Sequence, residues 1–125
     1  MADRPKILIV DDDPAVTELL ELKLDPLFEV RATNNPREVQ AIARALQPQV
    51  VVCDIDMPVM DGGEVCRRLR EDPSTAHIPV LYLTGMVSPA EVVDMGGEVG
   101  GRPGVSKNAQ VQEIARRIQE VMRSG

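Results

Sequence analysis

The chain is poor in aromatic residues. Of its 125 residues only Phe28 and Tyr82 are aromatic, so aliphatic side chains must form most of the core. Stacking on bases, on which single-stranded nucleic-acid binding relies, has few side chains to use. Basic charge is also scarce, because 14 Lys and Arg against 20 Asp and Glu give a net charge of −6. This balance argues against direct binding of nucleic acid or of an anionic membrane surface.

Cysteines are few and long apolar runs are absent. Cys53 and Cys66 are too few for a disulfide framework, and Cys53 lies in an apolar run where a small buried residue is expected. No apolar run approaches the roughly 20 residues of a membrane-spanning helix, and the polar N-terminus lacks the apolar core of a secretory signal. We therefore expect one soluble, cytoplasmic domain over residues 1–125.

Short apolar segments alternate with segments of helical periodicity. The predicted strands lie near residues 7–10, 28–33, 50–53, 80–83 and 105–106. Helices are predicted near residues 14–24, 36–46, 63–71 and 109–122, with a short one ending near Met95. This alternation predicts an α/β fold with an open, doubly wound, five-stranded parallel sheet and helices on both faces. Residues 94–104 hold five of the nine glycines and are expected to form a mobile loop.

Polar residues follow the predicted strands. Three aspartates follow the first strand, one the third, a threonine the fourth and a lysine the fifth: Asp11, Asp12, Asp13, Asp54, Thr84 and Lys107. Because the carboxyl ends of parallel strands meet at one edge of a sheet, these side chains are expected to converge. Carboxylates about 4 Å apart repel by roughly 4 kcal/mol, so the cluster requires a cation, and oxygen ligands favour Mg²⁺. Ordinary strand-end turns, in which Asp is common, are the alternative.

Several segments together resemble the receiver domain of two-component response regulators. They are ILIVDDDP at residues 7–14, VVVCDIDMPVMDGGEVCRRLR at residues 50–70, LYLTG at residues 81–85, and Lys107. The second segment is the most specific, because an aspartate that ends an apolar strand is followed by Met-Pro and then by Met-Asp-Gly at a helix start. The resemblance covers essentially the whole chain and implies a flavodoxin-like (CheY-like) fold with strand order 2-1-3-4-5.

The resemblance implies an acceptor and a metal site. Asp54 would accept a phosphoryl group as an aspartyl phosphate. Asp11 and Asp12, together with Asp54 and the backbone carbonyl of Asp56, would hold Mg²⁺. Asp13 is expected at the start of the first helix instead, where a carboxylate favours the positive helix end.

Two further residues and the partners follow from the same resemblance. Thr84 would bond a phosphoryl oxygen, and Lys107 would pair with the phosphoryl group and offset its negative charge. The phosphoryl donor would be a histidine kinase or a phosphotransfer protein. The signal would pass to a downstream effector protein or to a tethered output domain. The domain would assist its own phosphorylation and dephosphorylation without being an enzyme of steady turnover.

Three features depart from the usual pattern of this family. Asn108 follows the lysine where proline is usual, and a trans bond is favoured there because a non-proline cis bond costs about 3–4 kcal/mol. Gly104 stands where an aromatic residue that reorients on phosphorylation is usual. A glycine-rich run over residues 96–104 replaces part of the fourth helix and its loop. We therefore expect output to depend on ordering of residues 94–104 or on the face of the first helix.

Two other functions are compatible with the sequence. An interaction module that keeps the fold without transferring phosphate is favoured by the altered segment at Lys107 and Asn108, and disfavoured by Asp12 and Asp54. A phosphohydrolase of the haloacid dehalogenase type is suggested by Asp-Ile-Asp at residues 54–56, but such enzymes need a cap or a larger core. The chain is expected to be either an independent receiver or a piece of a longer protein.

Overall fold

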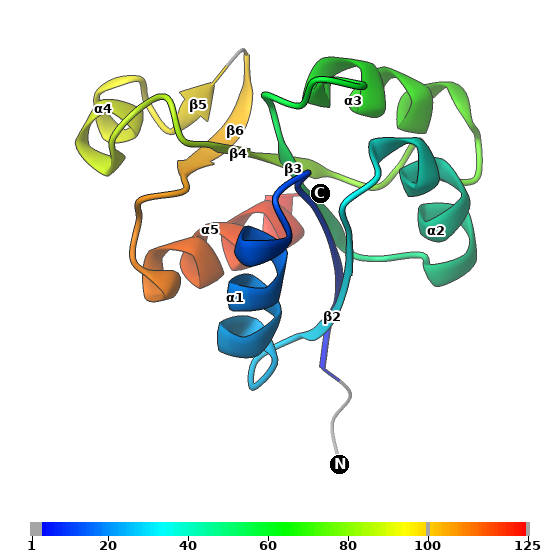
Figure 1. Cartoon of the computed structure of the whole chain (residues 1–125), viewed down its shortest axis with the longest axis horizontal. Helices are drawn as coiled ribbons and strands as arrows, with labels where there is room; N and C mark the ends of the chain where they lie inside the picture. Colours follow the sequence, from blue (N-terminus) through cyan, green and yellow to red (C-terminus); the bar gives the residue numbers. More distant parts are fainter. Residues whose placement is uncertain (1–3, 100, 125) are drawn as a thin grey trace.

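The computed structural model, which describes residues 4–99 and 101–124, has a central sheet (Figure 1). Its parallel strands are β1 (Lys6–Val10), β2 (Glu29–Thr33), β3 (Val50–Asp54), β4 (Val80–Thr84) and β6 (Arg102–Ser106). A short strand, β5 (Glu98–Val99), pairs antiparallel with β6. The strand order is β2-β1-β3-β4-β6-β5. The predicted doubly wound parallel sheet is confirmed, and the short antiparallel strand was not predicted.

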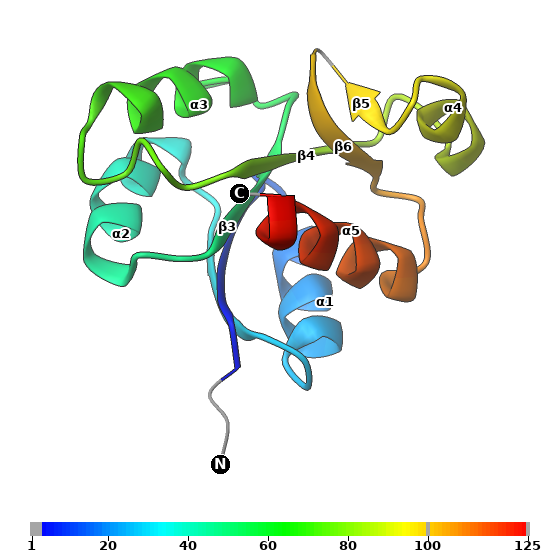
Figure 2. The same cartoon turned by 180° about the vertical axis from the view of Figure 1, so that it is seen from behind.

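Helices cover both faces of the sheet (Figures 1 and 2). One face carries α1 (Pro14–Leu24) and α5 (Val111–Ser124), and the other carries α2 (Val39–Leu46) and α3 (Gly62–Glu71). A 3₁₀ helix, η1 (Pro36–Glu38), precedes α2, and α4 (Pro89–Asp94) packs beside β6. No helix in the described part of the chain is both long and apolar enough to cross a bilayer.

The two faces of the sheet have separate cores because successive strand residues point in opposite directions. In β1, Ile7 and Ile9 pack with α1 and α5, whereas Leu8 and Val10 pack with α2 and α3. The strand β3 is buried along its whole length. Burial on both sides explains why the strands read as uninterrupted apolar runs in the sequence.

The helices α1 and α3 begin at side-chain caps. Asp13 accepts a hydrogen bond from the Ala15 N–H at 2.9 Å. Asp61 does the same for the Glu64 N–H at 2.9 Å, and each such cap contributes about 1 kcal/mol. The predicted place of Asp13 at the start of the first helix is confirmed.

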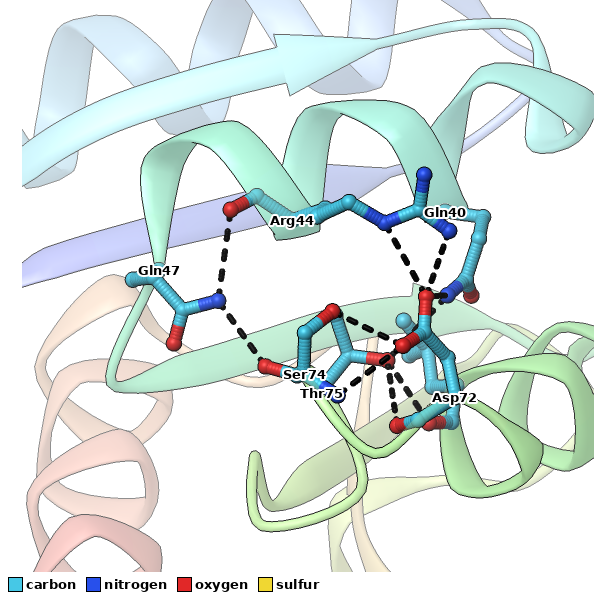
Figure 3. Close-up of polar contacts among 7 residues, drawn as sticks. Gln40, Arg44, Gln47, Asp72, Ser74 and Thr75 are labelled. Carbon is cyan, nitrogen blue, oxygen red and sulfur yellow. Dashed lines mark hydrogen bonds and ion pairs between the residues drawn. The ribbon is translucent and has the colours of Figure 1, made fainter.

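Asp72 connects α2 to the segment between α3 and β4 (Figure 3). Its Oδ2 accepts a hydrogen bond from Nη2 of Arg44 at 2.6 Å, and its Oδ1 accepts one from the Ser74 N–H at 2.9 Å. The Arg44 guanidinium and the Ser74 bonds hold the pKa of Asp72 well below its usual range. Gln47 at the end of α2 also donates to the Ser74 carbonyl at 2.9 Å, so the short helix is fixed at two points.

The prediction of a loop over residues 94–104 was wrong at residues 98–99 and 102–104, which form strands. After α4 the chain turns through Gly96 and Gly97, whose φ angles of 75° and 78° are ones that glycine adopts without strain. Val99 then pairs with Arg102. The fifth parallel strand therefore begins three residues earlier than the predicted residues 105–106.

Two tertiary contacts hold this hairpin. A Cβ atom at Gly104 would lie 2.6 Å from Cγ2 of Val99, so the Val99 side chain lies in the space above the glycine. From α5, Nη2 of Arg117 donates a hydrogen bond to the Gly97 carbonyl at 2.7 Å, and the Gly104 N–H donates to the same carbonyl at 3.0 Å. The missing side chain at residue 104 is thus what allows the hairpin to pack.

Candidate functional site

The C-terminal ends of four neighbouring strands meet at one edge of the sheet. In sheet order, β1 is followed by Asp11, β3 ends at Asp54, β4 ends at Thr84 and β6 is followed by Lys107. The backbone N–H of Lys107 donates a hydrogen bond to the Thr84 carbonyl at 2.7 Å, which joins the last two of these ends. The convergence expected from the strand ends is present.

Three carboxylates form the centre of this edge. Asp11, Asp12 and Asp54 each offer an oxygen, and these oxygens lie within 4.8 Å of one another. Asp11 and Asp54 are 0% and 1% exposed, whereas Asp12 faces solvent. Backbone N–H groups hold one oxygen of each buried acid: Asp13 donates to Oδ1 of Asp11 at 2.9 Å, and Asp56 donates to Oδ1 of Asp54 at 3.2 Å.

Lys107 supplies the positive charge at this cluster. Its Nζ lies 2.8 Å from Oδ2 of Asp11 and 3.1 Å from Oδ2 of Asp54. Among the described residues, Oδ2 of Asp11 and Oδ2 of Asp54 accept no well-aligned hydrogen bond. The Lys107 ammonium group contacts both oxygens as their ion-pair partner. Burial opposes the charge on Lys107, but its ion pairs with Asp11 and Asp54 outweigh burial and raise its pKa.

Burial changes the ionisation of Asp54. Burial raises its pKa to about 6, although the ammonium group of Lys107 acts in the opposite direction. Burial favours the neutral acid because removing a charge from water is costly. Additional positive charge beside Asp54 would therefore favour its carboxylate form.

The donor set of this cluster fits Mg²⁺. All three candidate ligands are carboxylates, which is the oxygen chemistry that Mg²⁺ takes. Two of them carry buried oxygens without a well-aligned hydrogen bond, and the third reaches solvent, where the coordinated waters that Mg²⁺ retains have room.

The residue after Lys107 has a clear local role. All described peptide bonds are trans, including the bond before Asn108. The Asn108 N–H donates a hydrogen bond to Oγ of Ser106 at 3.1 Å, and Ser106 Oγ donates to the Val87 carbonyl at 2.7 Å. Proline at residue 108 would have no N–H for this bond. The trans Asn108 nevertheless leaves Lys107 in contact with both buried acids.

Thr84 and the two methionines of the β3–α3 loop are buried. Thr84 is buried, and its Oγ1 accepts a hydrogen bond from the Met86 N–H at 3.1 Å. Met57 and Met60 are buried in the core beneath α2 and α3. Their burial favours loop packing.

Gly62 lies beside the site, and its structural role could not be predicted from the sequence. A Cβ atom there would lie 2.8 Å from the Asp54 carbonyl oxygen and 3.1 Å from Cα of Ile55. The Gly62 N–H also donates a hydrogen bond to the Ile55 carbonyl at 3.0 Å. The start of α3 thus packs directly on the backbone that carries Asp54, and only glycine permits this approach.

We expect Gly62→Ala to lower the free energy of unfolding by about 1–3 kcal/mol, the usual cost of overpacking. Gly63→Ala is the matched control, because a Cβ at Gly63 meets only the Asp61 side chain at 3.3 Å. Alanine at that helical position should be neutral or stabilising by up to about 1 kcal/mol. Urea unfolding of the two variants measures the difference, and equal effects would show that Gly62 is not constrained.

Comparison with known proteins shows the family of this chain. A family model described as the response regulator receiver domain matches residues 7–119. The chain belongs to this family. It is a phosphoacceptor signalling domain of a two-component system. Receiver domains generally bind Mg²⁺ at an acidic cluster, and the corresponding cluster here contains Asp11, Asp12 and Asp54.

Relatives of this receiver domain include transcriptional regulators. The DNA-binding dual master transcriptional regulator RpaA of Synechocystis sp. is 36% identical over 95% of this chain and 49% of its own length. The DNA-binding response regulator MtrA of Mycolicibacterium smegmatis is 32% identical over 96% of this chain and 51% of its own length. The receiver domain thus spans about half the length of these curated relatives.

Solved structures of similar proteins share the receiver fold. A putative response regulator from Chloroflexus aurantiacus has a TM-score of 0.80 and 31% identity, covering 97% of this chain and 99% of that one. The chemotaxis protein CheY4 of Vibrio cholerae has a TM-score of 0.78 and 28% identity, covering 94% of this chain and 98% of that one. The fold implied by the sequence resemblance is confirmed.

Proposed function

We propose that this receiver domain accepts a phosphoryl group on Asp54 from a phosphohistidine of a histidine kinase or phosphotransfer protein. The observation that carries the proposal is a buried carboxylate at a strand end, 3.1 Å from a lysine ammonium and beside two further acids. The carboxylate needs no general base, because an ionised aspartate is already nucleophilic.

In the transfer step an oxygen of Asp54 attacks phosphorus while the phosphorus–nitrogen bond of the donor breaks. The bonding electron pair leaves with the imidazole nitrogen. Lys107 lies beside the acceptor oxygen and offsets the repulsion between two anionic groups. Mg²⁺, bound by Asp11, Asp12, Asp54 and the Asp56 carbonyl, would supply the remaining positive charge.

The phosphorylated state would differ from the free state through Thr84 and Lys107. The Thr84 hydroxyl would exchange its contact with the Met86 N–H for a bond to a phosphoryl oxygen, so the β4–α4 segment shifts with it. Ligand contacts that differ between two conformations change their populations. The recipient of this change is an effector protein or a tethered output domain, and the receiver acts in the cytoplasm without itself binding nucleic acid or membrane.

This function predicts a metal-dependent mass gain. Incubation with Mg²⁺ and a small acyl phosphate should add the mass of one phosphoryl group, measured by intact-protein mass spectrometry. Asp54→Asn should abolish the gain. Asp61→Asn should retain it, because asparagine caps a helix as well as aspartate does. A wild-type chain that gains no mass, either from the acyl phosphate or from a phosphorylated phosphotransfer protein, would instead be a receiver-like interaction module.

A further inference from the structure

One side chain outside the acidic cluster holds the backbone of the cluster. Nδ2 of Asn34, in the loop after β2, donates hydrogen bonds to the Asp11 carbonyl and to Oγ1 of Thr17, each at 2.9 Å. The Asp11 N–H donates to the Thr33 carbonyl at 3.3 Å. The two backbone polar groups of Asp11 are therefore bonded to the last residue of β2 and to the first residue of the loop that follows it.

Thr17 determines which group donates in its hydrogen bond with Asn34. It is buried in α1, and its hydroxyl donates a hydrogen bond to the Pro14 carbonyl at 3.1 Å. Its oxygen is then the acceptor for Asn34, so both hydrogens of the Asn34 amide are used. The amide bridges the end of β1 and the first turn of α1, which are the two ends of the segment that carries the acids at residues 11–13.

We propose that Asn34 is a positioning residue for the metal site. Its two donated bonds keep residues 11–13 in place, so that the oxygens of Asp11 and Asp12 stay close to Asp54. A restraint is needed because three carboxylates within 4.8 Å repel one another. The inference rests on the proposed function, since it assigns Asn34 to the Mg²⁺ site on which that function depends.

Asn34→Asp tests this role because it keeps the shape and removes both donors. It also adds a negative charge, which by electrostatics alone would attract Mg²⁺. Asn35→Asp is the matched control: the Asn35 side chain caps η1 by accepting the Arg37 N–H at 3.0 Å, and aspartate can accept the same bond. Both variants thus gain one charge in neighbouring positions, and only one of them loses the bridge.

We expect Asn34→Asp to weaken Mg²⁺ binding about tenfold, as loss of a supporting hydrogen bond at a metal site does. Asn35→Asp should bind Mg²⁺ as tightly as the wild type or more tightly. Isothermal titration calorimetry with MgCl₂, well below the unfolding temperature, measures both. In phosphorylation by acyl phosphate, the Mg²⁺ concentration for half-maximal rate should rise while the rate at saturating Mg²⁺ stays near the wild-type value, a separation that general destabilisation does not produce.

The proposal is overturned if Asn34→Asp binds Mg²⁺ as tightly as Asn35→Asp. If Asn34→Asp does not fold, Asn34→Ala removes the same donors without adding charge, and an unchanged Mg²⁺ affinity in that variant also overturns it. Failure here is separable from failure of the proposed function. In the first case the wild type and Asn35→Asp still bind Mg²⁺ and gain a phosphoryl group; in the second, none of the proteins does, and both proposals fall.

Discussion

Gly104→Ala should lower the free energy of unfolding by about 2 kcal/mol, and Val99→Ala in the same chain should recover most of that loss. The reason is a specific contact, because the new Cβ would lie 2.6 Å from Cγ2 of Val99. A β-branched side chain cannot rotate freely out of the way. Gly104 does not have the positive φ of Gly96, Gly97 and Gly101, so its backbone accepts alanine and the cost comes from packing.

A double-mutant cycle measures this coupling by urea unfolding of the two single variants and the double variant. Removing Cγ2 of Val99 relieves the 2.6 Å contact and leaves only the Cβ of residue 99 at 3.0 Å. Gly→Ala at an unstrained position also stabilises by about 0.4–1 kcal/mol through the unfolded state. The double variant should therefore be more stable than Gly104→Ala alone. If the losses in free energy of unfolding of the two single variants simply add in the double variant, Val99 does not occupy the space above residue 104.

Asp54→Asn should stabilise the metal-free domain at pH 8 by up to about 3 kcal/mol. Burial raises the pKa of Asp54 from an ordinary 3.8 to about 6, and each unit corresponds to about 1.4 kcal/mol. A raised carboxyl pKa favours folding below pH 3.8, and that contribution is lost as the pH rises through about 6. Asparagine has no charge to bury, so the variant keeps the stability that the wild type loses.

Urea unfolding at pH 4, 6 and 8 without Mg²⁺ tests this dependence. The difference in the free energy of unfolding between variant and wild type should grow mainly between pH 4 and pH 6, and pH 8 should lie on the plateau. In the variant, Lys107 keeps the ion pair with Asp11 that is 2.8 Å long in the wild type, so its ammonium group is not left unpaired. Asp61→Asn, the same substitution at an exposed carboxylate, is the control. A difference of equal size at pH 4 and pH 8 would contradict a burial effect.

Local patterns in the sequence were sufficient for the sheet and for the chemistry at its edge. Apolar runs on buried strands and helical periodicity are properties of neighbouring residues, and they placed Asp11, Asp54, Thr84 and Lys107 at strand ends. The parallel arrangement then required those ends to meet. The roles assigned to these residues stay predictions until the experiments above are done.

Contacts between distant segments could not be predicted in the same way. Nothing near Gly104 in the sequence shows that Val99 folds back over it, and glycine-rich composition by itself favours a loop. The constraint on Gly62 comes from the backbone of Asp54, and the bonds of Asn34 reach Asp11, 23 positions earlier. Such features depend on tertiary packing, which overrides local propensity.

The two-residue strand β5 also changes what the sheet presents beyond β6. A full-length parallel strand at the border of a sheet exposes a row of unpaired N–H and C=O groups, to which another chain can add. Here β5 covers part of β6, and it is itself very short and carries the exposed, charged Glu98. Strand addition and aggregation through this border are therefore disfavoured, which leaves helical surfaces as the more suitable places for contact at this end of the molecule.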